Sequence, residues 1–547
     1  MRREGRLVPL LHEHARRQPA RTAVTQRLPG GRYLETSYAE LARKVNLFSG
    51  LFRRRLRPGA IIPIYMGKSA DCIAAIYGAL ESGHVFSCLN PKFRGPQISA
   101  VLQASNADAA LVDGPGLMTL RNSLSDPACE AVRQPEWLLL QGDPPVPLFE
   151  KATRELSGSL KIRHFNEPPA EEPSTAADDR HEDAHLPACC LFTSGSTGTP
   201  KGVLISRRDL ENRTWAEVEW FELGSEDVLL SILPFSFDVG LNQLMTALAI
   251  GCELVLADSW LPADILDTAA ARRVSGISGV PSIWQDMLRV QARFDTAGKH
   301  KSLRYITVSG GSLPSRQLLE LPGLAPGVAI FKTYGQTEAF RAASLRPSEF
   351  STKSESVGRA FTGVRLYVVN ESGRPCAPGE IGEIVHSGLG VMTGYLQSAD
   401  TALKLRPNPF FSAADSHPLA VFTGDYGCID DDGYLFLRGR HDTMLKISGN
   451  RVYPEEITRQ LLAIPGVAMA EVVGVRDDSG ESHLAAFASL AKGAALSEAE
   501  IQRSLAARLP SYMAPRRVLL LEEMPRTASG KPDKQELLAL ARRSVNL

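Results

Sequence analysis

The chain has 547 residues, of which 44% are hydrophobic and 22% are charged. That length exceeds what one hydrophobic core serves, so it indicates at least two domains, and the composition is typical of a globular protein. Basic and acidic residues balance at 61 against 61, which argues against a nucleic-acid binder that relies on net charge. No apolar run reaches the roughly 18 residues of a membrane span, and the apolar run before His12 is too short for a secretory signal. We therefore expect a cytoplasmic protein with no membrane span.

The first part of the chain alternates helical and strand-like segments. Apolar residues at helical spacing predict helices, and short continuous apolar runs predict buried strands. Strand, helix and strand joined by short turns predict parallel α/β layers. The predicted segments are helices over 38–48, 70–83 and 98–104 and strands over 61–66, 85–89 and 109–113.

The middle of the chain continues the alternation, and its texture changes after Arg365. Short alternating segments punctuated by Gly and Asp-Gly turns there predict a small antiparallel subdomain. A compact region of about a hundred residues closes the chain, which is the size of a small domain. The predicted helices cover 207–221, 242–250, 454–464 and 498–509, and the strands cover 228–233, 252–257, 304–308, 468–475 and 484–490.

The most informative motif is the stretch 191–202, Leu-Phe-Thr-Ser-Gly-Ser-Thr-Gly-Thr-Pro-Lys-Gly. It joins two strand-like runs through a turn of glycines and hydroxyl residues, with Lys201 near its end. Converging backbone N–H groups, hydroxyl donors and a lysine suit a polyphosphate. The spacing is not that of the G-x-x-x-x-G-K-[ST] loop, because Pro200 stands five residues after Gly195 and Gly202 follows Lys201.

Three further motifs carry groups that a nucleotide reaction needs. The first is the run from Lys332 to Glu338, which supplies a ring, a hydroxyl and a carboxylate that could stack on a base, bond a phosphate and hold Mg²⁺. The second is Asp425, beside Gly424, which could accept ribose hydroxyls or belong to a solvated hairpin. The third is Lys531, at the end of Pro-Arg-Thr-Ala-Ser-Gly-Lys, which taken alone is an ordinary surface lysine.

Together and in this order, the four motifs resemble the adenylate-forming superfamily of acyl-CoA synthetases, luciferases and peptide-synthetase adenylation domains. The resemblance implies that a carboxylic acid reacts with ATP to give acyl-AMP and pyrophosphate, with Mg²⁺ as cofactor. It further implies transfer of the acyl group to CoA or to the phosphopantetheine thiol of an acyl or peptidyl carrier protein. We expect a stand-alone enzyme, because the chain ends soon after Lys531 without a carrier sequence.

The resemblance also implies an α/β fold with two domains. A large N-terminal domain (1–438) would combine parallel α/β sheets with the antiparallel subdomain. A hinge (439–442) that contains Asp442 would lead to a small mobile α+β C-terminal domain (443–547) carrying Lys531.

By the same resemblance, Tyr334 flanks adenine, Thr337 meets the α-phosphate and Glu338 binds Mg²⁺. Asp425 binds the ribose, Arg440 lies beside ribose and phosphate, and Lys531 is the catalytic lysine. The implied nucleotide-binding residues are Thr193, Ser194, Gly195, Ser196, Thr197, Gly198, Lys201, Gly310, Gly311, Ser312, Thr333, Tyr334, Gly335, Asp425 and Arg440.

The acid is not determined by these motifs. Asp238 matches the aspartate that pairs with the α-ammonium in amino-acid-activating relatives, and a buried carboxylate without a cation would be costly. The surrounding residues, together with the run from Thr337 to Arg341, also resemble a group of bacterial acyl-CoA ligases, in which Asp238 could pair with Arg341 or cap a helix. Arg341 could instead meet a second carboxylate of the substrate. The matched pocket positions are Asp238, Val239, Asn242, Ser278, Val308, Gly310, Thr333 and Arg341.

Two stretches depart from the family pattern. Ser206-Arg207-Arg208 replaces a usual histidine and could alter the lining of the carboxyl pocket. The segment 394–401 lacks a usual proline, and we expect neither departure to touch an assigned catalytic group. The alternatives to an amino-acid-activating ligase are an acyl-CoA ligase for a fatty, aryl or dicarboxylic acid, an amidating or luciferase-like enzyme, and a non-catalytic binding protein that keeps the fold.

Overall fold

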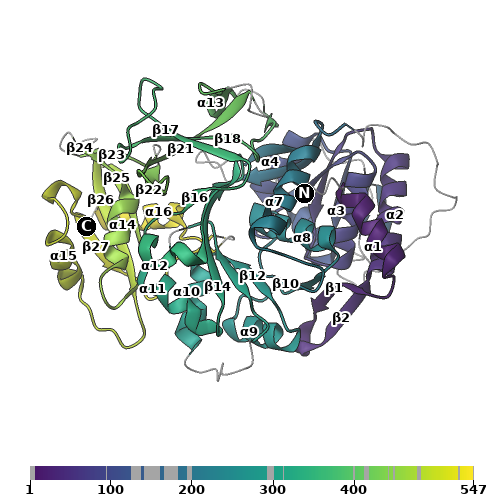
Figure 1. The fold of residues 1–547 in the computed structure, drawn as a ribbon, viewed down its shortest axis with the longest axis horizontal. Coiled ribbons are helices and arrows are strands. Elements are labelled where there is room, and N and C mark those ends of the chain that lie inside the picture. The colour runs from purple at the N-terminus through teal and green to yellow at the C-terminus, as the bar shows by residue number, and fades with distance from the viewer. Residues whose placement is uncertain are drawn as a thin grey trace.

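A computed structural model gives the arrangement of the chain (Figure 1). The structure describes residues 6–93, 95–124, 137–140, 161–164, 183–193, 200–291, 301–311, 313, 315–397, 401–411, 418–440, 443–447, 450–476, 482–527 and 530–545.

An eight-stranded sheet forms the first half of the large domain. Its strand order is β19-β9-β8-β4-β3-β5-β6-β7, and β3 pairs in parallel with both β4 and β5. The predicted parallel layering is therefore confirmed for this sheet. The strands are β3 (Ile61–Tyr65), β4 (Val85–Cys88), β5 (Ala109–Val112), β6 (Trp137–Leu140), β7 (Lys161–His164), β8 (Pro187–Thr193), β9 (Lys201–Ser206) and β19 (Gly394–Tyr395).

A nine-stranded sheet forms the second half, in the order β16-β15-β14-β13-β12-β10-β11-β1-β2. The neighbours from β14 to β11 pair in parallel, and antiparallel strands lie at both edges. The strands are β1 (Thr22–Arg27), β2 (Tyr33–Ser37), β10 (Val228–Ser231), β11 (Glu253–Leu256), β12 (Gly276–Gly279), β13 (Tyr305–Val308), β14 (Ala329–Gln336), β15 (Phe340–Leu345) and β16 (Arg359–Ala360).

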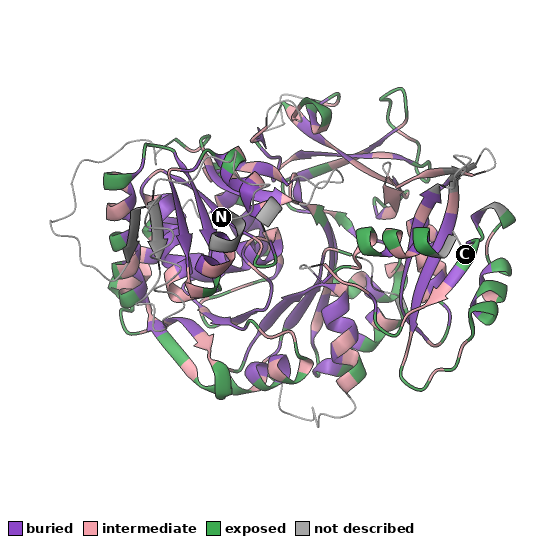
Figure 2. Cartoon of the chain, turned by 180° about the vertical axis from the view of Figure 1, so that it is seen from behind, coloured by how far each residue is buried: buried purple, intermediate pink, exposed green. Residues whose placement is uncertain are grey.

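Helices cover both faces of each large sheet, and Figure 2 shows the strands of these sheets mostly buried. The largest hydrophobic cluster joins α1 (Leu7–Arg17), α2 (Tyr38–Arg55), α3 (Ala70–Glu81) and α8 (Asp238–Ile250) to strands of both sheets, so these helices lie between the sheets. Helices α4 (Gly95–Ser105) and α5 (Gly114–Leu124) pack on the outer face of the first sheet. Helices α9 (Pro262–Ala271), α10 (Pro281–Gln291) and α11 (Ser315–Glu320) pack on the outer face of the second.

The predicted antiparallel subdomain is present as a five-stranded sheet. Strands β17, β18, β21 and β20 lie side by side, β22 pairs with β21, and every pairing is antiparallel. The strands are β17 (Val364–Val369), β18 (Gly382–Gly388), β20 (Leu405–Pro407), β21 (Leu419–Ile429) and β22 (Leu435–Arg440), preceded by α12 (Phe350–Lys353) and accompanied by α13 (Thr401–Lys404).

The C-terminal part of the chain is a small α+β unit with its own hydrophobic clusters. Strands β25 (Val467–Arg476), β26 (Ser482–Leu490) and β27 (Arg517–Leu520) form one sheet, and β23 (Leu445–Ile447) pairs with β24 (Asn450–Val452). Helices α14 (Pro454–Leu462), α15 (Glu498–Ala506) and α16 (Lys534–Val545) complete it. The predicted fold class is thus confirmed, whereas the exact domain boundaries remain predictions.

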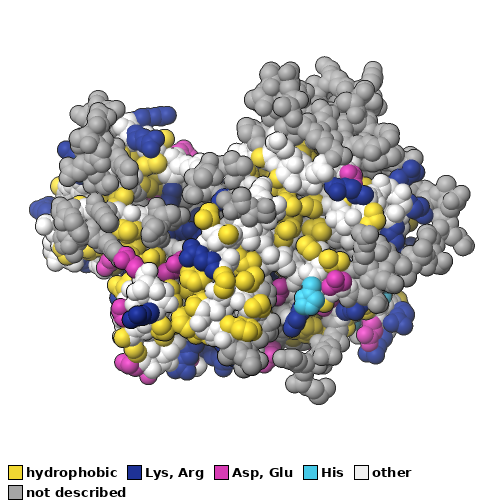
Figure 3. All heavy atoms as spheres, turned by 90° about the horizontal axis from the view of Figure 1, so that it is seen from above, with side chains coloured by type: hydrophobic (Ala, Val, Ile, Leu, Met, Phe, Trp, Pro, Cys, Tyr) yellow, Lys and Arg dark blue, Asp and Glu magenta, His cyan; other side chains and the backbone are white. Residues whose placement is uncertain are grey.

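Some predicted elements differ at their ends. Helix α8 begins at Asp238 rather than at Asn242, and strand β12 was not predicted at all. The early start of α8 matters because it places Asp238 at the positive end of a helix dipole. Within the described part of the chain, no helix is long and apolar enough to cross a membrane. Figure 3 shows acidic and basic side chains interspersed over one face, as their equal numbers lead one to expect.

Candidate active site

The flanks of the predicted phosphate loop form a β-hairpin. Strands β8 and β9 are antiparallel, with Thr193 opposite Lys201, and the Thr193 hydroxyl lies 3.4 Å from the Lys201 carbonyl oxygen. The turn itself, from Ser194 to Thr199, lies outside the described residues. The hairpin therefore fixes where the loop starts and ends on the sheet.

Lys201 is connected to Glu338 through Tyr395. The Lys201 ammonium lies 5.8 Å from the centroid of the Tyr395 ring, and the Tyr395 hydroxyl donates to Glu338 Oε1 at 2.7 Å. Strand β19, which carries Tyr395, pairs with β9 and so holds the ring beside the loop. Segment 394–401 thus contacts Glu338 through Tyr395, whereas the position of its missing proline lies outside the described residues.

A tight hairpin presents Thr337 and Glu338. Strands β14 and β15 are joined by the turn that carries both residues, and Gly335 lies opposite Arg341. A Cβ on Gly335 would stand 2.0 Å from the Phe340 carbonyl oxygen, so only glycine fits there. Phe340 itself has a φ of 52°, a strained value for a bulky residue. Close packing of the two strands fixes the direction of the turn.

Tyr334, Asp425 and Arg440 form one connected group. The Tyr334 hydroxyl donates to Asp425 Oδ2 at 2.5 Å, and Arg440 Nη1 donates to Asp425 Oδ1 at 3.1 Å. Asp425 lies within β21, directly opposite Arg440 on β22, and its side chain is 14% exposed. The alternative interpretation of Asp425 as a solvated hairpin residue is wrong. Burial raises the pKa of Tyr334 well above its ordinary value, and Asp425 raises it further, so the hydroxyl remains a donor.

Lys404 is a cation of this site that sequence reasoning missed. Its ammonium donates to the Thr423 carbonyl oxygen, one residue before Gly424. Burial lowers the pKa of Lys404, with Arg440 acting in the same direction and Glu338 and Asp425 opposing it. The helix α13 that carries Lys404 is only one turn long, so no helical periodicity marked it in the sequence.

The predicted catalytic lysine reaches the carboxyl end of β13. Gly310 follows that strand with a φ of 77°, and a Cβ on Gly310 would lie 3.4 Å from Lys531 Cε. Gly311 is the next residue, whereas Ser312 lies outside the described residues. Two residues 221 positions apart in the sequence, Gly310 and Lys531, are therefore neighbours in space.

The surroundings of Lys531 are charged on several sides. Its side chain keeps an exposed surface, although many protein atoms surround it. Desolvation is accordingly the main cause that lowers the pKa of Lys531, while Asp238 and Asp425 oppose that shift. The charges of Asp238, in the predicted acid pocket, and of Asp425, in the predicted ribose site, thus both act on the ammonium.

An ion pair anchors the segment that carries Lys531. Arg526 Nη1 lies 2.8 Å from Asp286 Oδ2, and its Nη2 lies 3.3 Å from Asp286 Oδ1. Asp286 belongs to α10 of the large domain, and the neighbouring Gln285 donates to the Ala468 carbonyl oxygen of the C-terminal unit at 3.1 Å. Helix α10 therefore holds the C-terminal unit in the position that delivers Lys531.

If the chain forms an adenylate as its sequence predicts, we expect Asp286→Ala to slow that step about fivefold, because a partly buried ion pair contributes about 1 kcal/mol. Transfer of the acyl group from a supplied adenylate should be unchanged. Pyrophosphate exchange and single-turnover thiolation measure the two steps separately. Asp267→Ala, on the exposed side of α9, is the matched control. An equal loss in both steps would show that Asp286 supports the fold rather than the position of Lys531.

Asp238 is the first residue of α8. Its Oδ1 accepts a hydrogen bond from the backbone N–H of Val239 at 2.8 Å. Within the described part of the chain, the carboxylate makes no other hydrogen bond. Burial raises the pKa of Asp238, whereas the charges of Arg341, Arg213 and Lys531 act in the opposite direction. The carboxylate is thus surrounded by three protein cations, none of which is directly paired with it.

Arg341 is paired with a residue that the sequence did not reveal. Its Nε donates to Glu217 of α7 (Arg207–Trp220), and both side chains are only 4% exposed. Its Nη1 donates to Thr333 Oγ1 at 2.8 Å and to Ser309 Oγ at 3.1 Å. Its Nη2 is buried and has no hydrogen-bond partner among the described residues. The suggested pairing of Asp238 with Arg341 is therefore wrong, since Glu217 takes that place.

The remaining pocket positions divide into two groups. Val239 and Val308 are buried in the hydrophobic cluster on the second sheet, and Ser278 is buried on β12. Asn242 Nδ2 lies 3.5 Å from the Arg213 carbonyl oxygen, which directs it toward α7. Arg207, one of the residues that depart from the family pattern, donates to the Leu80 carbonyl oxygen at 2.8 Å. It therefore lines a second pocket among the first helices and not the predicted acid pocket. The predicted hinge residue Asp442 lies outside the described residues.

Comparisons with known sequences agree with this arrangement. A family model described as AMP-binding enzyme matches residues 11–396, and one described as AMP-binding enzyme C-terminal domain matches residues 456–531. Bacitracin synthase 3 of Bacillus licheniformis is 26% identical over 534 residues, which are 96% of this chain but 8% of that protein. Indoleacetate–CoA ligase of Aromatoleum aromaticum is 28% identical over 543 residues, 98% of each chain.

A solved structure shares the fold over its whole length. ATP-bound MatB from Rhodopseudomonas palustris superposes with a TM-score of 0.77 and covers 98% of this chain and 99% of that one, at 21% identity. The two chains thus have the same architecture of a large α/β domain followed by a small C-terminal domain.

Proposed function

The chain belongs to the AMP-binding enzyme family, and from this premise we propose that it activates a carboxylic acid with ATP and passes the acyl group to a phosphopantetheine thiol. The observation that carries the proposal is the position of Lys531. Its side chain lies against Gly310 and is influenced by Asp238 on one side and Asp425 on the other. The Lys531 ammonium would therefore lie where the acid and the nucleotide meet.

The nucleotide would bind through the residues around Lys201, Tyr334 and Asp425. Lys201 and the loop that precedes it would hold the β- and γ-phosphates, and Asp425, with Arg440, would hold the ribose. Thr337 would meet the α-phosphate. Lys404 is an additional cation beside this nucleotide site, since a Cβ on Gly424 would stand 3.0 Å from its ammonium nitrogen.

Glu338 fits the requirement of a magnesium ion. Mg²⁺ is usually held by one or two carboxylates together with substrate phosphates, and it neutralises phosphate charge when bound. Glu338 offers one carboxylate next to the phosphate loop, oriented by the hydroxyl of Tyr395. The described residues contain no group of three or more acidic, His or Cys side chains that could hold a metal without such phosphates.

In the first step, a carboxylate oxygen of the acid forms a bond to the α-phosphorus of ATP, and the bond to the β-phosphate oxygen breaks to release pyrophosphate. Negative charge on the acid and on the α-phosphate must approach each other, and Lys531 would offset that repulsion. In the second step, a thiolate would attack the acyl carbon and AMP would leave. CoA and a carrier-protein arm carry the same thiol, so both are candidate acceptors.

For the acid, we favour a carboxylic acid without an α-amine, such as an aryl, fatty or dicarboxylic acid. Arg341, Arg213 and Lys531 offset part of the cost of burying the Asp238 carboxylate, which lessens its need for a substrate ammonium. The relative that matches along its full length is a CoA ligase of an aryl-substituted acid. An amino acid is the second candidate, because Asp238 Oδ2 makes no hydrogen bond within the described part of the chain and could accept one from an ammonium group.

Pyrophosphate exchange tests the proposal directly. The purified full chain is incubated with ATP, Mg²⁺ and labelled pyrophosphate, together with aryl, fatty, dicarboxylic or amino acids. Exchange that depends on one class of acid supports the proposal and identifies the class. Silence across the whole panel would favour a non-catalytic protein with this fold. Product analysis with CoA, carrier protein or an amine then separates thiol ligation from an amidating or luciferase-like outcome.

Asp238→Ala distinguishes the two classes of acid. If the substrate carries an α-amine, we expect exchange to fall about 100-fold, because a buried charge-assisted pair is lost. If the substrate is a plain acid, the change should stay within about threefold, since the nearby cations make no direct pair with Asp238. Asp267→Ala, at an exposed side chain, is the matched control. The measurement is exchange with the best acid of the panel and with its amino-substituted or deaminated analogue.

A further inference from the structure

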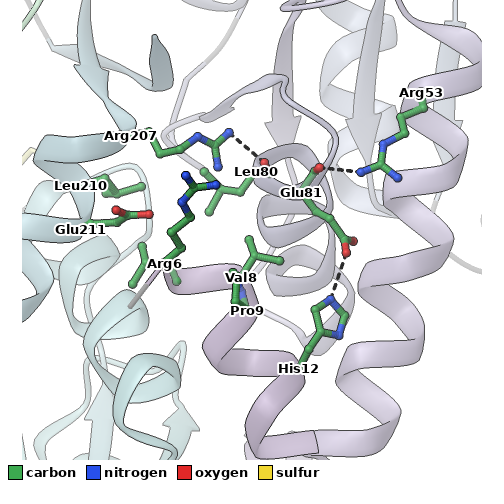
Figure 4. A pocket seen from close by; sticks show the side chains of 11 residues that line it. Arg6, Val8, Pro9, His12, Arg53, Leu80, Glu81, Arg207, Leu210 and Glu211 are labelled. Atoms are coloured by element: carbon green, nitrogen blue, oxygen red, sulfur yellow. Dashed lines mark hydrogen bonds and ion pairs between the residues drawn. The ribbon is translucent and has the colours of Figure 1, made fainter. Parts of the chain in front are cut away.

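A second pocket lies away from the residues described above, among the first helices of the chain. It has a volume of about 350 Å³ and lies between the start of α1, the facing ends of α2 and α3, and the first turns of α7 (Figure 4). Pockets of this size hold small organic molecules. None of its lining residues belongs to the proposed nucleotide or acid site.

Two arginines lie side by side at one end of the pocket. Figure 4 shows the guanidinium groups of Arg6 and Arg207 close together between α7 and α3. Arg207 donates to the Leu80 carbonyl oxygen at 2.8 Å, which does not offset its charge. Burial lowers the pKa of Arg207, Glu211 opposes that shift and Arg6 adds to it. An anion between the two arginines would relieve both the desolvation and the repulsion.

At the other end, a third arginine contacts Glu81. Arg53 Nη2 donates to the Glu81 carbonyl oxygen at 2.7 Å, and His12 Nε2 lies 3.0 Å from Glu81 Oε1. Arg53 Nε is buried and has no hydrogen-bond partner among the described residues. Among the residues that line the pocket, three are arginines and two, Glu81 and Glu211, are carboxylates.

The walls between the two ends are apolar. Val8 and Pro9 of α1 face Leu80 of α3 and Leu210 of α7 across the pocket. A purely inorganic anion would leave these side chains in contact with water. A ligand with an apolar body would cover them, and burying apolar surface contributes about 25 cal/mol per Å².

We propose that this pocket binds a small organic monoanion, with its carboxylate or phosphate head between Arg6 and Arg207 and a short apolar body against Val8, Leu80 and Leu210. The site is independent of the proposed activity. It rests on the adjacent guanidinium groups and the apolar walls, neither of which the acid–thiol reaction uses.

The test is direct binding to the full chain. Calorimetry measures the binding, and hydrogen exchange of the segment 6–17 locates it. The probes are hexanoate and hexyl phosphate, with hexylammonium, hexanol and inorganic phosphate for comparison. We expect hexanoate or hexyl phosphate to bind and to protect segment 6–17, and the relative strength of the two identifies the preferred head group. Hexylammonium and hexanol should not protect this segment.

Arg6→Gln is the decisive variant, because Arg6 is exposed and its replacement leaves the core intact. Losing one charge-assisted contact should weaken binding about tenfold and remove the protection. Arg16→Gln, on the exposed face of the same helix, should bind like the unchanged chain. Binding of the anions at the acid pocket alone would survive Arg6→Gln and would overturn the proposal. Equal protection by hexylammonium or by hexanol, or no protection by either anion, would also overturn it.

Discussion

Replacing Lys531 by alanine is expected to reduce adenylate formation about 100- to 1,000-fold, the range measured when one preorganised charge-stabilising group is removed from an active site. The reason is its position. The side chain reaches Gly310 at the end of β13 and lies within the influence of Asp238 and Asp425. ATP–pyrophosphate exchange with the acid found in the panel measures the loss.

The same variant should still transfer the acyl group when the adenylate is supplied, because that step forms no new bond to phosphorus. A quenched assay of thioester formation from synthetic acyl-adenylate measures the rate of this transfer. Lys492→Ala, an exposed lysine of the C-terminal unit, should leave both steps unchanged. If Lys531→Ala keeps more than a third of the exchange rate, the lysine does not have the role proposed for it.

Replacing Glu217 by alanine is expected to lower the free energy of unfolding by about 3–5 kcal/mol, since removing one partner leaves a buried charge uncompensated. The uncompensated group is Arg341, which contacts Ser309 and Thr333 through Nη1 but depends on Glu217 for its charge. Both side chains are 4% exposed, so water cannot replace the carboxylate without opening the packing of α7 against β15. Urea unfolding followed by tryptophan fluorescence measures the change.

A double variant separates the ion pair from simple loss of packing. Glu217→Met combined with Arg341→Met should recover most of the stability, because two apolar side chains of similar size need no compensation. Glu219→Ala, two residues away on the exposed face of α7, should change the free energy of unfolding by less than about 0.5 kcal/mol. A loss below about 1 kcal/mol for Glu217→Ala would contradict the view that Arg341 is held by this carboxylate.

Several site features could be predicted from the sequence because they lie within one short segment. The phosphate loop is flanked by two apolar runs, and these became the paired strands β8 and β9. The run from Tyr334 to Glu338 was recognisable as a unit because its ring, hydroxyl and carboxylate are consecutive or nearly so. Alternating helices and strands indicated parallel layers for the same reason, since their periodicity is local.

The pairings that complete the site could not be predicted in this way. Tyr395 and Glu338 are 57 positions apart, Tyr334 and Asp425 are 91 apart, and Glu217 and Arg341 are 124 apart. Glu217 in particular looked like one more charge on a polar helix. Its hydrophobic neighbours did not mark it as buried, because α7 has only a weak apolar face.

The sequence by itself predicted the groups of the site: a loop suited to a polyphosphate, a carboxylate suited to magnesium, an acidic residue suited to a ribose and a lysine near the C-terminus. The tertiary structure alone decided which partners those groups have, since polar side chains pair by proximity in space and no local periodicity encodes that proximity. In the folded chain Lys531 lies against Gly310, and Asp425 accepts hydrogen bonds from Tyr334 and Arg440. Arg341 pairs with Glu217 and not with Asp238.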